Sequence, residues 1–281
     1  MKDFTIAIYC FIDDLLQKIE KKELDSRRKL NDAQVITIAI VSARFFYGNQ
    51  ATACTYLREH FGFNIPDKSN FNRILHSLSD LISELFYHLS AVFKYLNLES
   101  VYIIDSFPVP VCKNVPVCKN IRISRSKIVK GEEFRGYNAS KKEYFYGFKV
   151  HLISTGEGMP VEFLITAGSI HDNTALQMMA VDLPENSDLY GDSAYINAEI
   201  KALLAEFQRI RIKAATKKNS KVRDTWAEEL ENKYFRKPIE TTFSQVTYNF
   251  PKKIHAVTSD GFLLKLLIAI ITLILHKYLG L

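Results

Sequence analysis

The chain has 281 residues, which is enough for one large domain or two small ones. Its hydrophobic fraction of 47% is normal for a globular protein with a sizeable core. Lysine and arginine outnumber aspartate and glutamate by 37 to 31, which gives a net charge of +6. This moderate excess suits a polyanionic partner such as nucleic acid, although many proteins of similar charge bind none.

The four cysteines argue against two classes of protein. No pair among Cys10, Cys54, Cys112 and Cys118 has the spacing of zinc ligands, and the N-terminus does not resemble a cleaved signal peptide. We therefore expect reduced thiols in a cytosolic protein rather than a zinc module or a secreted chain.

The first hundred residues predict helices. An N-cap at Asn31 or Asp32 opens a helix over the apolar-periodic residues 35–46. A second helix, capped by Asn49, closes at Gly62. This pattern predicts an all-α N-terminal region over residues 1–97.

A third helix in this region suggests a helix-turn-helix. Ser69 could cap it, and its apolar residues recur at helical spacing. Two short helices with a glycine-containing connection before a polar helix start are typical of that motif. It would present four polar side chains to DNA: Lys68, Asn70, Asn72 and Arg73. An ordinary three-helix bundle with solvated polar ends fits the pattern equally well.

Strand-like patterns begin near Val101. Residues 101–104 form a short apolar run that ends at Asp105 and is followed by a proline-rich turn. Residues 146–153 alternate in polarity, and residues 161–166 follow a turn that contains two glycines. These runs are close in sequence, so we expect antiparallel hairpins.

Helices then alternate with strands. Helices are predicted over residues 172–179 and 197–207, and strands over residues 188–190 and 209–214. Antiparallel strands followed by helix-connected strands predict a mixed α/β layer. That order matches the ribonuclease H-like fold, so residues 98–281 are expected to form a ribonuclease H-like mixed sheet core with helices.

Three carboxylates could converge in such a domain. The fold brings the ends of its first and fourth strands side by side, where Asp105 and Asp192 stand. Glu240 lies in residues 236–243, which look like the first turns of a helix. Converging carboxylates repel one another unless a cation lies between them, so a hard-metal site for phosphoryl chemistry is expected. Plainer interpretations remain, because Asp192 could cap a turn and Glu240 could complement a helix dipole.

Neighbouring polar residues are open to two interpretations. Asp172 follows a strand, and we expect it to cap the next helix rather than to stand near the carboxylates. His151 is expected to be a packed or surface residue rather than a ligand. Arg236 lies one helical turn before Glu240 and could contact the scissile phosphate or pair with a neighbouring acid.

A basic run could contact DNA. It contains Lys217, Lys218, Lys221 and Arg223. Such a run is usually a solvated loop, but in a DNA enzyme it could grip phosphates without reading the sequence.

Two further segments have simple expectations. Residues 109–114 are repeated at once as residues 115–120, which indicates a short duplication in an exposed loop. The apolar residues 262–275 include Lys265 and are shorter than the roughly 20 residues that a membrane span needs. We expect a buried core helix and no membrane anchor.

Five short motifs resemble transposases of bacterial insertion sequences, and most closely their 982 family. They are residues 104–109 (Ile-Asp-Ser-Phe-Pro-Val), 135–137 (Arg-Gly-Tyr), 146–149 (Tyr-Gly-Phe-Lys), 190–195 (Tyr-Gly-Asp-Ser-Ala-Tyr) and 236–244 (Arg-Lys-Pro-Ile-Glu-Thr-Thr-Phe-Ser). Each is weak alone, but together and in this order they are specific. The likeness runs from about Asn31 to the C-terminus. It departs from the family in the second copy of the hexapeptide, which puts full activity in doubt.

The resemblance implies a catalytic triad of Asp105, Asp192 and Glu240 that binds two Mg²⁺ ions, for which Mn²⁺ could substitute. It also implies double-stranded DNA as partner, both the inverted-repeat ends and the target, with a homodimer holding the two ends. A bacterial cytoplasmic, nucleoid-associated location would follow. A host nuclease of the same fold and a transposase-derived DNA-binding protein without catalysis are the alternatives.

Overall fold

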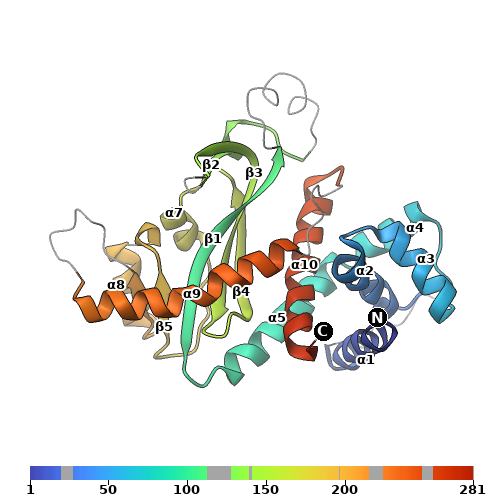
Figure 1. The fold of residues 1–281 in the computed structure, drawn as a ribbon, viewed down its shortest axis with the longest axis horizontal. Helices are drawn as coiled ribbons and strands as arrows, with labels where there is room; N and C mark the ends of the chain where they lie inside the picture. Colours follow the sequence, from blue (N-terminus) through green and yellow to red (C-terminus); the bar gives the residue numbers. More distant parts are fainter. Residues whose placement is uncertain are drawn as a thin grey trace. The chain divides into compact units, whose positions relative to one another are not determined.

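The computed structural model describes residues 1–19, 28–112, 128–138, 141–195, 197–214, 224–248 and 256–280. The chain divides into two compact units, Met1–Leu89 with Gln245–Leu281, and Ser90–Ser244 (Figure 1). This grouping differs from the predicted division after residue 97, because the C-terminal segment is grouped with the N-terminal helices. Most of the tandem hexapeptide lies outside the described residues, and so do Lys217, Lys218, Lys221 and Arg223.

The first unit is helical. It contains α1 (Lys2–Ile19), α2 (Asp32–Phe46), α3 (Gln50–Phe61), α4 (Lys68–Ser77), the larger part of α5 (Ser79–Leu96) and α10 (Ser259–Leu279). Two predicted N-caps are confirmed. The side chains of Asn31 and Gln34 each accept a hydrogen bond from the other's backbone N–H, which forms a capping box. Asn49 caps α3, which ends at Gly62.

The predicted third helix is wrong in two details. Its N-cap is Asp67 rather than Ser69, because the Asp67 carboxylate accepts hydrogen bonds from the backbone N–H groups of Ser69 and Asn70 at 3.0 and 3.1 Å. The apolar run also breaks at Leu78, so α4 ends there and α5 begins at Ser79.

Helix α10 is a buried helix of the first unit. By length and composition it could cross a membrane, since it has 21 residues rather than the shorter run expected from the sequence. However, 67% of its most apolar window is buried inside the protein, and the helix packs against α2. The expectation of a core helix therefore depends on burial and not on length.

The described part of the second unit contains a six-stranded mixed sheet. Its strands are β1 (Val101–Cys112), β2 (Arg135–Asn138), β3 (Glu143–Thr155), β4 (Pro160–Ala167), β5 (Asp188–Gly191) and β6 (Arg211–Ala214). β1 is antiparallel to β3 and parallel to β5, which is parallel to β6. β2 and β4 pair antiparallel with the far edge of β3. The predicted mixed α/β architecture is confirmed at this level.

Asp105 lies within β1 rather than at its end, and the predicted proline-rich turn is part of the same strand. Strands tolerate proline where its missing N–H would face an unpaired edge. The Asp188 N–H donates to the Ser100 oxygen, so even-numbered backbone groups of this segment point toward β5. In the described strands, β5 pairs with the beginning of β1 alone, and no strand lies beside Pro108 and Pro110 on that edge.

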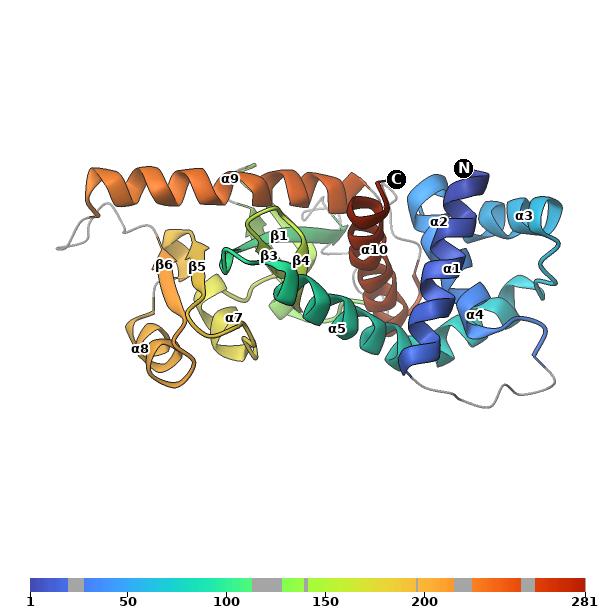
Figure 2. The same cartoon turned by 90° about the horizontal axis from the view of Figure 1, so that it is seen from below.

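Helix α9 (Trp226–Tyr248) covers one face of the sheet (Figure 2). The prediction that residues 236–243 form the first turns of a helix is wrong, because α9 starts at Trp226 and Pro238 lies inside it. An interior proline costs about 3 kcal/mol of helix stability, which packing must offset. Ile239 is fully buried in a cluster with Val101, Ile103 and Tyr190, against which Phe235 and Phe243 pack.

The opposite face is covered by α7 (Asp172–Met178), α8 (Ala198–Phe207) and the end of α5 (Figure 2). Two short 3₁₀ turns complete the described part of the unit, η2 (Glu132–Phe134) before β2 and η3 (Ser193–Tyr195) after β5. Helix α8 connects the parallel strands β5 and β6, as the sequence predicted. The sheet therefore has helices on both faces.

Candidate active site

Asp105 lies on the face of β1 that α9 covers. One carboxylate oxygen accepts the backbone N–H of Ser106 at 2.7 Å, and the other lies 3.5 Å from the guanidinium of Arg236. Burial raises the pKa of Asp105 to about 6, although these two partners oppose the rise, and the negative charges of Asp192 and Asp172 add to it. Of the two interpretations of Arg236, the structure shows pairing with an acid, and that acid is Asp105.

Asp192 follows β5 directly, as predicted, and β5 lies beside β1. The backbone N–H of Ala194 donates to the Asp192 carboxylate at 2.8 Å, so Asp192 does cap the turn that begins η3. Its charge also acts on Asp105 and raises the pKa of that residue. The turn cap and the paired carboxylate are thus two properties of one residue.

Glu240 lies in the interior of α9, one turn after Arg236, and its side chain is exposed. Its position excludes a role in complementing the dipole of a helix N-terminus. Among the residues that the structure describes, no group of three His, Cys, Asp or Glu side chains is arranged to hold a metal ion. The structure therefore brings Asp105 and Asp192 together, and it does not bring Glu240 into a three-residue metal group with them.

The donor set at Asp105 and Asp192 fits a hard divalent cation. Both residues supply carboxylate oxygens, which Mg²⁺ and Mn²⁺ prefer. A backbone N–H already orients one oxygen of each carboxylate, and a positive charge, Arg236, already lies beside Asp105. Burial and the neighbouring negative charges raise the pKa of Asp105, and a bound cation would offset both by stabilising the ionised carboxylate.

Asp172 was expected to cap α7, and that expectation is wrong. The N-cap position is His171, without a side-chain capping bond, and Asp172 is the first residue of the helix. The Asp172 carboxylate instead accepts the hydroxyl of Ser106 at 2.7 Å and lies 3.4 Å from both the Lys149 ammonium and the His151 ring. Sequence reasoning missed this cluster, although Ser106 follows Asp105 directly.

His151 is fully buried, as a packed residue rather than a surface one. Its pKa is lowered to about 4, mainly by burial and also by the charge of Lys149, while the charge of Asp172 opposes the change. Its ring lies 3.0 Å from the Thr166 hydroxyl and 3.4 Å from the Tyr195 hydroxyl. The ring is therefore neutral at physiological pH and is held by hydrogen bonds on both sides.

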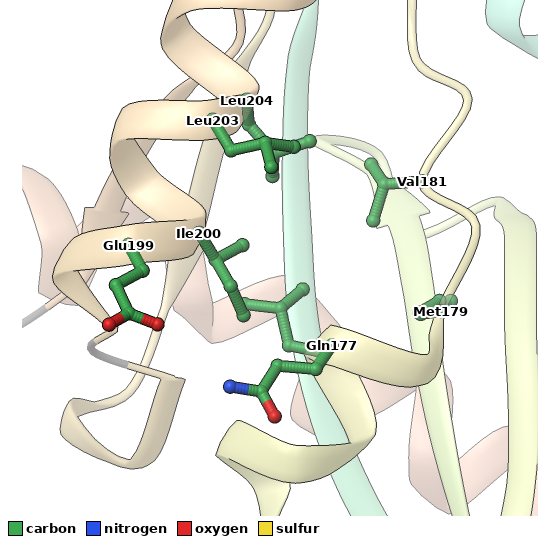
Figure 3. A pocket seen from close by; sticks show the side chains of 8 residues that line it. Gln177, Met179, Val181, Glu199, Ile200, Leu203 and Leu204 are labelled. Atoms are coloured by element: carbon green, nitrogen blue, oxygen red, sulfur yellow. The ribbon is translucent and has the colours of Figure 1, made fainter.

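A separate cavity of about 310 Å³ lies between α7 and α8 (Figure 3). Most of its lining is apolar, with Gln177 and Glu199 as the polar exceptions. It includes none of the carboxylates predicted to be catalytic. The predicted chemistry therefore does not depend on this cavity.

The predicted DNA-contacting residues of the first unit all lie in the first turns of α4. Lys68 and Arg73 are exposed, Asn70 and Asn72 are partly exposed, and Arg73 donates a hydrogen bond to Asn70 at 2.8 Å. They share the polar part of a helix whose buried residues are Phe71 and Leu75. Their accessibility is compatible with DNA contact, which stays a prediction.

Comparison with known proteins identifies the family. Residues 96–275, nearly two thirds of the chain, match the family model of the transposase DDE domain. The match includes Asp105, Asp192 and Glu240, and it extends from the end of α5 into α10. Searches of curated proteins and of solved structures found no match. The chain belongs to the family of transposases with a DDE domain.

Proposed function

We propose that this protein is the transposase of an insertion sequence similar to the 982 family, which cleaves DNA at the transposon ends and joins them to target DNA. The observation that carries the proposal is the pair Asp105, on β1, and Asp192, directly after the neighbouring parallel strand β5, within the matched domain. The strand order β4-β3-β1-β5-β6, with β1, β5 and β6 parallel, supports a ribonuclease H-like core.

Asp105, Asp192 and Glu240 would hold two divalent cations, Mg²⁺ or Mn²⁺. When bound, such a pair stabilises the attacking and leaving oxygens of a phosphodiester. Each of the three carboxylates would supply oxygen ligands, which hard divalent cations prefer. Arg236, which pairs with Asp105, could also contact the scissile phosphate, so its two interpretations are compatible.

DNA binding is proposed for two groups of residues. Lys68, Asn70, Asn72 and Arg73 of α4 would contact the transposon end, and the basic run of Lys217, Lys218, Lys221 and Arg223 would grip phosphates. A homodimer would hold the two ends together in the bacterial cytoplasm, associated with the nucleoid. Replacing the three lysines of the run by alanine should flatten the salt dependence of DNA binding.

The test uses purified protein, labelled inverted-repeat ends, a target plasmid and Mg²⁺ or Mn²⁺. Asp105→Asn, Asp192→Asn and Glu240→Gln should each abolish cleavage and joining while end binding continues. Glu229→Gln, a change at another exposed glutamate of α9, is the matched control and should stay active. Undiminished cleavage by any of the three variants would refute the role of that residue.

The products also separate the alternatives. Joined products support the transposase, and cuts without joining indicate a host nuclease of the same fold. A shifted band without cuts indicates a transposase-derived DNA-binding protein, for which the tandem hexapeptide after Asp105 supplies a reason. In that last case, deletion of one hexapeptide copy should restore cleavage.

A further inference from the structure

Beneath Asp105, on the other face of the sheet, lies a polar network of six side chains. We define the polar network as Ser106, Lys149, His151, Thr166, Asp172 and Tyr195. They come from β1, β3, β4, α7 and η3, so the network connects five separate elements. His151 and Tyr195 are fully buried, and Ser106 lies opposite His151 in the pairing of β1 with β3.

Asp172 is the centre of this network. One of its carboxylate oxygens accepts the Ser106 hydroxyl at 2.7 Å and lies 3.4 Å from both Lys149 Nζ and His151 Nδ1. Lys149 supplies the compensating charge and also donates to the backbone oxygen of Ile170 at 3.2 Å. The Asp172 carboxylate is only partly buried, with 19% of its side chain exposed, and its contacts join β1, β3 and α7.

The polar network binds residues next to both proposed catalytic aspartates, Asp105 and Asp192. Ser106 follows Asp105 in β1, and their side chains point to opposite faces of the sheet. Tyr195 belongs to η3, whose backbone binds Asp192 twice, through the Ala194 N–H to the carboxylate and the Tyr195 N–H to the backbone oxygen. Movement of Ser106 or Tyr195 would therefore move a catalytic carboxylate.

β1 needs such a restraint at this point. In the described strands, β5 pairs with β1 through Val101–Ile103 and no further. From Asp105 to Cys112, the described strand that pairs with β1 is β3, and no described strand pairs with its other edge there. The bond from Ser106 to Asp172 adds a restraint on the opposite face of the sheet at this point.

We propose that Asp172 is a positioning residue, through which the polar network fixes the separation of the Asp105 and Asp192 carboxylates so that they bind divalent cations. The inference rests on the proposed function, because it takes these two aspartates as the cation ligands. Replacing a residue that orients a metal ligand typically weakens metal affinity by about 10–100-fold.

The test measures Mn²⁺ binding to the full chain by electron paramagnetic resonance of the free ion, and separately the Mn²⁺ concentration that gives half-maximal cleavage. Asp172→Asn should raise the dissociation constant for Mn²⁺ by about 10–100-fold and shift the half-maximal concentration by a similar factor. Saturating Mn²⁺ should restore most of the cleavage, since Asp172 itself contacts no substrate.

Asp188→Asn is the matched control. Asp188 is also an ion-paired aspartate of this unit, with 15% of its side chain exposed against 19% for Asp172, and its partners are Arg211 and Lys213. It should leave Mn²⁺ affinity within about twofold, so equal weakening by both variants would overturn the proposal. If Asp172→Asn does not fold, Ser106→Ala removes one bond of the network and should weaken Mn²⁺ binding several-fold.

The two possible failures are distinguishable. Mn²⁺ binding that is lost in Asp105→Asn but unchanged in Asp172→Asn would refute the positioning role alone. Mn²⁺ binding that survives both Asp105→Asn and Asp192→Asn would refute the proposed cation site, and the positioning role with it.

Discussion

Two groups on opposite faces of the same part of the sheet should give this protein an unusual dependence of stability on pH. The pKa of His151 falls from an ordinary 6.5 to about 4, mainly by burial, while burial raises the pKa of Asp105 from 3.8 to about 6. At about 1.4 kcal/mol per pKa unit, each difference corresponds to about 3 kcal/mol. The two contributions have opposite signs, because burial favours the neutral form of both groups.

For His151, the unfolded chain binds the proton more tightly. Its contribution to stability is complete above pH 6.5 and is lost as the pH falls toward 4. For Asp105, the folded protein binds the proton more tightly, so stability is gained as the pH falls from 6 toward 3.8. In the metal-free wild type the two slopes should largely cancel between pH 6 and 4.

The perturbation is His151→Gln, which removes the titrating ring and keeps a polar side chain. In this variant, the contribution of Asp105 is no longer cancelled, so acidification from pH 6.5 to 4 should raise stability relative to wild type by about 3 kcal/mol. Asp105→Asn should do the opposite and make the acid-induced loss steeper. The measurement is urea-induced unfolding in a metal chelator, followed by far-ultraviolet circular dichroism at several pH values.

The comparison uses differences between variants, so carboxylates that interact with neither His151 nor Asp105 cancel; Asp172, which acts on both groups, is the exception. If His151→Gln has the same pH dependence as wild type, the ring is not a buried neutral group and the reasoning fails. If only Asp105→Asn behaves like wild type, the burial of that carboxylate is refuted and the histidine argument stands.

Three further predictions concern stability, and unfolding free energies measured in urea check all of them. Lys94→Met removes the ammonium that lies 2.7 Å from the Glu162 carboxylate, so it should cost about 3–5 kcal/mol. A second change, Glu162→Leu, should recover much of that cost, and a cost below about 1 kcal/mol for Lys94→Met would contradict the reasoning. Ile239→Ala should cost about 2–5 kcal/mol and Lys237→Ala, at an exposed neighbour, less than about 0.5 kcal/mol, so equal costs would be evidence against the α9 packing. Gly147→Ala would place a methyl group 2.4 Å from a backbone oxygen of β1 and should destabilise the unit, whereas wild-type stability would mean that β1 and β3 are further apart.

Local signals were predictable because they depend on a few neighbouring residues. The caps at Asn31 and Asn49 follow from side-chain hydrogen bonding to nearby N–H groups, and the structure has both. The placement of Asp192 after β5 followed from a short apolar run. These predictions needed no knowledge of distant contacts.

The errors came from tertiary packing that overrides local preference. Proline signals a break, yet Pro108 and Pro110 continue β1, because they lie at an edge where no described strand requires the N–H that proline lacks. Pro238 signals a helix start, yet α9 runs through it, because the helix is held on the sheet by residues such as Ile239. Whether a proline ends an element depended in each case on contacts that are remote in sequence.

Asp172 shows the same limit at the candidate site. An aspartate at the start of a predicted helix is normally interpreted as an N-cap. The sequence alone does not distinguish such a cap from an aspartate that binds a serine far away in the chain. The difference arises because β3 brings Lys149 and His151 beside Ser106 of β1, where the Asp172 carboxylate accepts from Ser106 and Lys149 and lies 3.4 Å from the His151 ring. Alternation along β1 places the Asp105 side chain on the face that α9 covers, while the Ser106 side chain, one residue later, donates to Asp172 on the opposite face. The motif at residues 104–109 suggested Asp105 as a candidate from the sequence, whereas the contact of Ser106 is visible only in the hydrogen bonds of the structure.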